Sequence, residues 1–83
     1  MPQIDLQAYW GPTSFNLDCE DLKKLRAYLA SGNTSVVVIG AWSFQSQNGY
    51  LYYASGGNPW KYYIDMTANA IIAVIDKVVI EYC

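Results

Sequence analysis

The chain has 83 residues with five basic and seven acidic side chains, so its formal net charge is −2. This length holds one domain with one core, and we expect residues 1–83 to fold as a single domain. The weak negative charge argues against nucleic acid as a partner, because nucleic-acid binding normally needs a basic surface that displaces counterions. Only 14% of the residues are charged while 53% are hydrophobic, which leaves apolar side chains for an interface, either with another protein or in a homodimer.

The sequence lacks the marks of a membrane or exported protein. The longest apolar run, Ala70 to Ile75, stops at Asp76 and is too short to cross a bilayer. The first five residues have neither the basic start nor the apolar stretch of a signal peptide. We therefore expect a small soluble protein of the cytoplasm that does not enter membranes.

The first half of the chain predicts a strand and then a helix. Apolar and polar residues alternate from Gln3 to Trp10, which is typical of a half-buried strand. Asp18 is a favourable N-cap, and Gly32 with Asn33 suits the left-handed end of a helix. Between these caps, an apolar stripe recurs at helical spacing at Leu22, Leu25 and Leu29.

The middle of the chain predicts three strands joined by tight turns. Thr34 to Phe44 is apolar on both faces and favours a central strand. Asn48-Gly49 is the strongest short hairpin signal, because both residues accept a positive φ. Tyr50 to Ser55 then returns as a strand, Gly56 to Pro59 turns again, and Trp60 to Met66 forms the next strand.

The last segment, residues 70–83, fits two structures. As a helix it places six apolar residues on one face, yet its density of Ile and Val favours a strand, since these residues lose side-chain freedom in helices. We expect a strand. The predicted fold is α+β: one helix packed on a four- to five-stranded antiparallel meander, in the order β-α-β-β-β-β. The alternative fold ends in a C-terminal helix in place of the last strand.

The residues offer little for catalysis. There is no histidine, which removes Ser-His and Cys-His nucleophiles and histidine-containing zinc sites. There is no glycine-rich phosphate loop, so we expect no cofactor and no metal. Cys19 and Cys83 are either two free thiols, which we expect, or one bridge in an oxidising compartment. A small enzyme using Asp65 or Cys19 remains an alternative, but we expect no enzyme activity.

Aromatic side chains are the unusual feature of the sequence. Six rings lie within fourteen residues on two strands that we expect to be neighbours: Tyr50, Tyr52, Tyr53, Trp60, Tyr62 and Tyr63. One helix covers one face of a sheet only, so some rings must be exposed, where Tyr and Trp serve as interface anchors. Cross-strand ring pairs that only stabilise the sheet would explain the same pattern. Sugars also stack on such rings, with Gln45, Gln47, Asn48, Asn58 and Asp65 as polar partners.

The predicted order of elements resembles that of the cystatin family of cysteine-protease inhibitors. Gln45-Ser46-Gln47-Asn48-Gly49 is similar to the first-hairpin pattern of that family, and Pro59-Trp60 is similar to its second-hairpin pair. Gln47 stands where the family usually has Val, and Pro59-Trp60 comes before the fourth strand instead of the last, so we do not assign the chain to the family. The resemblance implies that two hairpin tips could form a wedge against a partner.

Together these features predict a small non-catalytic binding protein that docks sterically on a macromolecular partner, most simply a protein, as inhibitor, immunity or anti-defence proteins do. The predicted binding residues are Tyr50, Tyr52, Trp60 and Tyr62, with Asn48 and Asn58 at the hairpin tips. A homodimer that binds a small ligand or a carbohydrate is the alternative from another class.

Overall fold

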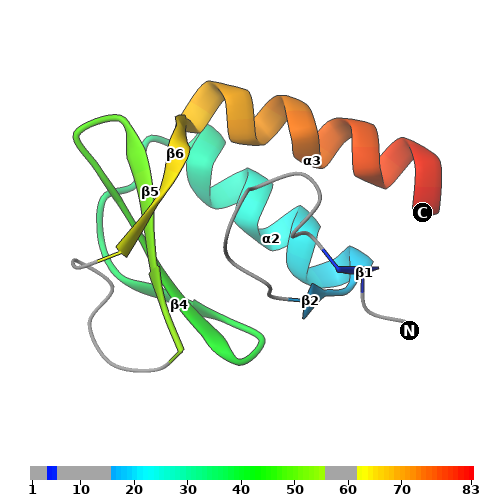
Figure 1. Ribbon diagram of the computed structural model, residues 1–83, viewed down its shortest axis with the longest axis horizontal. Helices are drawn as coiled ribbons and strands as arrows, with labels where there is room; N and C mark the ends of the chain where they lie inside the picture. The colour runs from blue at the N-terminus through cyan, green and yellow to red at the C-terminus, as the bar shows by residue number, and fades with distance from the viewer. Residues whose placement is uncertain (1–3, 6–15, 56–61) are drawn as a thin grey trace.

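The computed structural model describes residues 4–5, 16–55 and 62–83 and shows an α+β fold (Figure 1). The elements, in chain order, are β1 (Ile4–Asp5), β2 (Asn16–Leu17), α2 (Cys19–Ala30), β3 (Val37–Ile39), β4 (Trp42–Gln47), β5 (Tyr50–Ala54), β6 (Tyr62–Thr67) and α3 (Ala68–Tyr82). The predicted fold class is confirmed, with the C-terminal helix of the alternative form.

The main sheet is an antiparallel meander in the order β3-β4-β5-β6. β1 and β2 form a separate two-stranded pair, in which Ile4 lies opposite Leu17. The predicted strand from Gln3 to Trp10 therefore begins as expected at β1, and its remainder lies outside the described residues. The predicted turn from Gly56 to Pro59 also lies outside them.

Helix α2 forms as its local signals predict. The Asp18 carboxylate accepts a hydrogen bond of 2.8 Å from the backbone N–H of Asp21, which satisfies one of the donors that a helix start leaves without a partner. Gly32, just beyond the helix end, has a φ of +72°, a conformation that glycine adopts without steric cost. The leucines of the predicted stripe, at 22, 25 and 29, are all buried.

The predicted central strand from Thr34 to Phe44 is wrong, because the chain reverses in its middle. Val37–Ile39 and Trp42–Gln47 are two antiparallel strands, and Ile39 lies opposite Trp42. Gly40 has a φ of +63° at the first position of this two-residue turn, where hairpins with a type II′ turn require glycine. The apolar composition on both sides of Gly40 conceals this turn in the sequence.

The Asn48-Gly49 turn is confirmed. Both residues have positive φ, +52° and +83°, as a type I′ hairpin requires. Gln47 lies opposite Tyr50 across the turn. The carbonyl of Gly49 also accepts a hydrogen bond of 2.9 Å from the N–H of Ala68, so this hairpin tip is fixed to the start of α3.

Residues 68–82 form the helix α3, so the strand predicted over residues 70–83 is wrong. The Thr67 hydroxyl caps the helix by accepting a bond from the N–H of Ala70. Ile71, Ile75 and Val78 are fully buried on one face of the helix. Burial of these side chains outweighs the modest helix propensity of Ile and Val, because tertiary packing supplies most of the stability of a helix.

The two helices run antiparallel and lie on the same side of the sheet (Figure 1). Between them, Arg26 and Asp76 form an exposed ion pair with an Nε–Oδ1 distance of 2.5 Å. The hydrogen bond and the charge of Asp76 both raise the pKa of Arg26 above its ordinary value. Such an exposed pair adds little stability, so the helices are held mainly by the apolar contacts beneath it.

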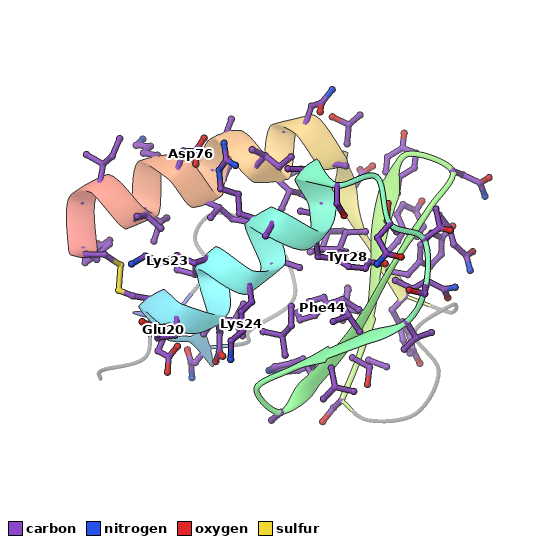
Figure 2. All side chains as sticks on the ribbon, turned by 180° about the vertical axis from the view of Figure 1, so that it is seen from behind. Glu20, Lys23, Lys24, Tyr28, Phe44 and Asp76 are labelled. Carbon is purple, nitrogen blue, oxygen red and sulfur yellow. A yellow bond between two sulfur atoms is a disulfide. The ribbon has the colours of Figure 1, made fainter. Side chains whose placement is uncertain are left out.

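A disulfide joins Cys19, at the start of α2, to Cys83, just beyond the end of α3. It closes the end of the helix pair that lies away from the sheet (Figure 2). The expectation of two free thiols is therefore wrong. The alternative, one bridge, is what the structure contains. The two cysteines are 64 positions apart in the sequence, and the antiparallel packing of α2 and α3 brings them together.

The core lies between the helix pair and one face of the sheet. Phe44, Leu51 and Ile64 contribute from the sheet and are at most 2% exposed. They belong to one cluster with the buried residues of both helices. Neither helix, over the described residues, has both the length and the apolar character needed to cross a membrane. Neither of the two described helices lies on the opposite face of the sheet, and that face holds the candidate site.

Candidate docking surface

Strand register defines the sheet face that points away from the helices, called here the outer face. Residues directly opposite each other in neighbouring strands project to the same face. Three cross-strand pairs therefore lie on one face: Gln45–Tyr52, Gln47–Tyr50 and Tyr52–Tyr63. The buried side chains of Phe44, Leu51 and Ile64 point to the other face, toward the helices. The paired positions of the outer face are Val38, Ser43, Gln45, Gln47, Tyr50, Tyr52, Ala54, Tyr63 and Thr67. Alternation along β6 adds Asp65, which lies between Tyr63 and Thr67. Ser43 is buried, so the glutamines and tyrosines form the accessible centre.

Three tyrosines form a contiguous cluster at the centre of the outer face. The ring centroid of Tyr63 lies 5.5 Å from that of Tyr50 and 5.4 Å from that of Tyr52. The planes of Tyr50 and Tyr63 are inclined by 64°, which brings a ring edge toward a ring face, a favourable arrangement for aromatic pairs. The planes of Tyr52 and Tyr63 are tilted by 41°. Tyr63 is 51% exposed and Tyr50 and Tyr52 are partly exposed. The cluster is thus held in place by its own ring contacts and still reachable by a partner.

Two glutamines extend the surface on β4. The side-chain amide of Gln47 donates to the side-chain oxygen of Gln45 at 2.9 Å, and the amide of Gln45 donates to the carbonyl oxygen of Thr34 at 3.1 Å. These bonds orient both side chains beside Tyr50 and Tyr52, their cross-strand neighbours. The outer face therefore combines aromatic rings with fixed amide groups.

The structure brings only some of the predicted binding residues together. Tyr50 and Tyr52 share the outer face, as alternation predicts, but Tyr62 lies on the helix side of the sheet, opposite Tyr53. There its ring is 6.3 Å from that of Tyr53 and is 62% exposed. Tyr63, which the predicted site omitted, occupies the position beside Tyr52. Only the register of β6 against β5 decides between these two neighbours, and no local signal in the sequence sets that register.

The predicted wedge of two hairpin tips is described at its first tip alone. Asn48 is exposed at the tip between β4 and β5. The second tip, from Gly56 to Pro59, lies outside the described residues, so the wedge stays a prediction. Asn58 and Trp60, the other predicted tip and anchor residues, lie outside the described residues.

The two residues considered for catalysis lie on different elements, Cys19 on α2 and Asp65 on β6. The Cys19 sulfur is bonded to Cys83, so it carries no thiol that could act as a nucleophile. Asp65 is exposed on the outer face. Within the described ranges no group of three or more Asp, Glu and Cys side chains is placed to hold a metal ion.

The chain matches no protein-family model, and comparison with curated proteins and with solved structures also gave no match.

Proposed function

We propose that this protein is a small non-catalytic binding protein that docks on a protein partner through the outer face of its sheet. The observation that carries the proposal is the exposure of Tyr63 at the centre of a ring cluster, on the face of the sheet away from both described helices. A ring that served only to stabilise the sheet would gain more by lying against the core.

The chemistry of this surface suits a protein interface. Tyrosine gives a large contact area at low entropic cost and can donate a hydrogen bond, so it is frequent among residues that dominate binding energy. Gln45 and Gln47 would lie at the polar rim that surrounds such anchors. The mechanism would be steric occlusion of the partner, as in inhibitor, immunity or anti-defence proteins.

The disulfide bears on where the protein works. Disulfides persist in oxidising compartments and are rare in the reducing cytoplasm. The Cys19–Cys83 bond therefore favours an oxidising location over the cytoplasm that the sequence predicts. Thiol labelling of protein taken from its native host distinguishes the oxidising location from the cytoplasm. Unlabelled cysteines would support the oxidising location, and labelling of both would support the cytoplasm.

A carbohydrate or small-ligand site on a homodimer is the second candidate. The ordered amides of Gln45 and Gln47 favour it, because they stand beside tyrosine rings on which a sugar could stack. A mass measurement in solution tests the dimer, and thermal shift with neutral oligosaccharides tests the ligand.

Affinity capture from the native host tests the main proposal. Wild-type protein, the variant Tyr52→Ala/Tyr63→Ala and the control Tyr62→Ala are used as baits, after circular dichroism has shown that each is folded. Wild type and Tyr62→Ala are expected to retain the same protein in stoichiometric amount, and the outer-face variant to lose it. Equal capture by all three baits, or no stoichiometric protein on wild type, would overturn the proposal.

A further inference from the structure

We propose that the partner places a guanidinium group, from an arginine side chain, over Tyr63 and against Asp65 on the outer face. This inference rests on the proposed function and names the chemistry of the contact. Three features carry it: the distribution of charge, the packing of the rings and the hydrogen-bond acceptors that the face presents.

The described part of the outer face carries one charge, which is negative. The lysines and arginine in the described part of the chain all lie on the helices, at positions 23, 24, 26 and 77, together with acidic residues of those helices; Figure 2 shows Lys23 and Lys24 on α2. Asp65 is the only charged residue on the outer face within the described ranges, and no ion pair links it to another described residue. The described part of the outer face therefore offers an unpaired carboxylate to a cation.

Asp65 stands next to the ring cluster. It is exposed and follows Tyr63 at the next outward position along β6, because Ile64 between them points into the core. Thr67, at the next outward position after Asp65, lies opposite Tyr50. A cation bound at Asp65 would therefore have tyrosines as neighbours, whose ring faces attract positive charge.

The packing of the rings selects the kind of cation. The rings of Tyr50 and Tyr52 each pack against Tyr63, with centroids 5.5 and 5.4 Å from its own, so neither ring leaves room for a rounded ammonium group between itself and Tyr63. A cation must instead lie on the outward side of Tyr63, within about 6 Å of the ring centroid. The planar guanidinium of arginine stacks on an aromatic face in this way, whereas the compact lysine ammonium is more strongly hydrated.

The outer face also presents acceptors for the five N–H donors of a guanidinium. The Asp65 carboxylate is one. The side-chain oxygen of Gln47 is a second acceptor. The Gln47 amide nitrogen donates to Gln45, while the Gln47 side-chain oxygen receives no hydrogen bond from the described residues. Asp65 and Gln47 flank the tyrosines on β6 and β4, so acceptors lie on both sides of the stacking surface.

Nuclear magnetic resonance titration with short peptides tests the inference. The probes are tetra-arginine, tetra-lysine and tetra-glutamine, each acetylated and amidated at its ends. The chemical shifts of the tyrosine ring protons of the isotope-labelled protein are followed. We expect tetra-arginine to shift the signals of Tyr50, Tyr52 and Tyr63 and to bind about threefold or more tightly than tetra-lysine, and tetra-glutamine to shift none of them. Ring shifts with neutral chitotriose but none with tetra-arginine would overturn the inference in favour of a sugar.

Matched charge removals decide the role of Asp65. Asp65→Asn is expected to weaken tetra-arginine binding about threefold or more, whereas Glu81→Gln, an equal charge change on α3, should leave it within about twofold. Equal weakening by both variants would overturn the inference, because it would show only a response to net charge. If Asp65→Asn binds tetra-arginine as wild type does while Tyr52→Ala/Tyr63→Ala loses the captured protein, the arginine contact fails and the proposed function stands.

Discussion

Tyr62 and Tyr63 are adjacent in β6 and similarly exposed, at 62% and 51%, yet they project to opposite faces of the sheet. Tyr62 contacts the ring of Tyr53 on the helix side, and Tyr63 contacts Tyr50 and Tyr52 on the outer face. The pair therefore offers two chemically identical substitutions that test one face at a time.

The buried hydroxyl of Tyr28 is expected to contribute to stability. It donates to the carbonyl oxygen of Ser35 and accepts from the N–H of Ser46 at 2.9 Å, so it ties α2 to the following loop and to β4. Tyr28→Phe would leave these two backbone groups without their partner and lower the free energy of unfolding by about 1–3 kcal/mol. Urea denaturation measures this loss. Tyr62→Phe is the control and should change it by less than about 0.5 kcal/mol; equal effects would contradict the assigned bonds.

The disulfide is expected to stabilise the fold by restricting the unfolded chain. With a sequence separation of 64 between the cysteines, the chain-entropy relation gives about 4 kcal/mol. Reductant should therefore lower the melting temperature of wild type and bring it to that of Cys19→Ser/Cys83→Ser, which should itself be insensitive to reductant. A wild-type melting temperature that does not respond to full reduction would count against this contribution.

Because residues 68–82 form a helix, we expect substitutions to be destabilising at positions three or four residues apart. Ile75 and Val78 are both fully buried, three residues apart, whereas in a strand they would point to opposite faces. Ile75→Ala and Val78→Ala should each lower the free energy of unfolding by about 2 kcal/mol or more. Ile80→Ala, at a position that is 85% exposed, should cost less than about 0.5 kcal/mol. A mild effect at either buried position would argue against the helix.

The turn at Gly40 is expected to be less tolerant than the helix end at Gly32, although both have positive φ. An added Cβ costs about 1–2 kcal/mol in the left-handed region at either position. At Gly40 it would also lie 3.0 Å from Oδ2 of Asp21, whereas at Gly32 it meets no atom within 4 Å. Denaturant unfolding should rank Gly40→Ala as the more destabilising variant, and the reverse order would show that Asp21 moves aside without cost.

Elements with complete local signals could be predicted from the sequence. The ends of α2 follow from Asp18 and Gly32, and the hairpin of β4 and β5 follows from Asn48-Gly49. These signals act over a few residues, so tertiary structure is not needed to interpret them. The uncovered sheet face with exposed tyrosines could also be predicted, because two strands carry more rings than one side of a sheet can bury.

Features set by contacts between distant residues could not be predicted. The helix α3 depends on burial of Ile71, Ile75 and Val78 against the core, which overrides the strand preference of β-branched residues. The disulfide depends on how α2 and α3 pack. The choice of Tyr63 over Tyr62 depends on strand register, including the irregularity in β5–β6 pairing between Tyr50 and Tyr52.

Binding of the captured partner to single variants of the Tyr62 and Tyr63 pair tests the docking surface most directly. Isothermal titration calorimetry should give a dissociation constant for Tyr63→Ala at least about tenfold above that of wild type, a loss of about 1.4 kcal/mol, with Tyr62→Ala within about threefold. Heteronuclear spectra must show both variants folded. Equal affinities for the two variants, or a larger loss for Tyr62→Ala, would contradict docking through the outer face.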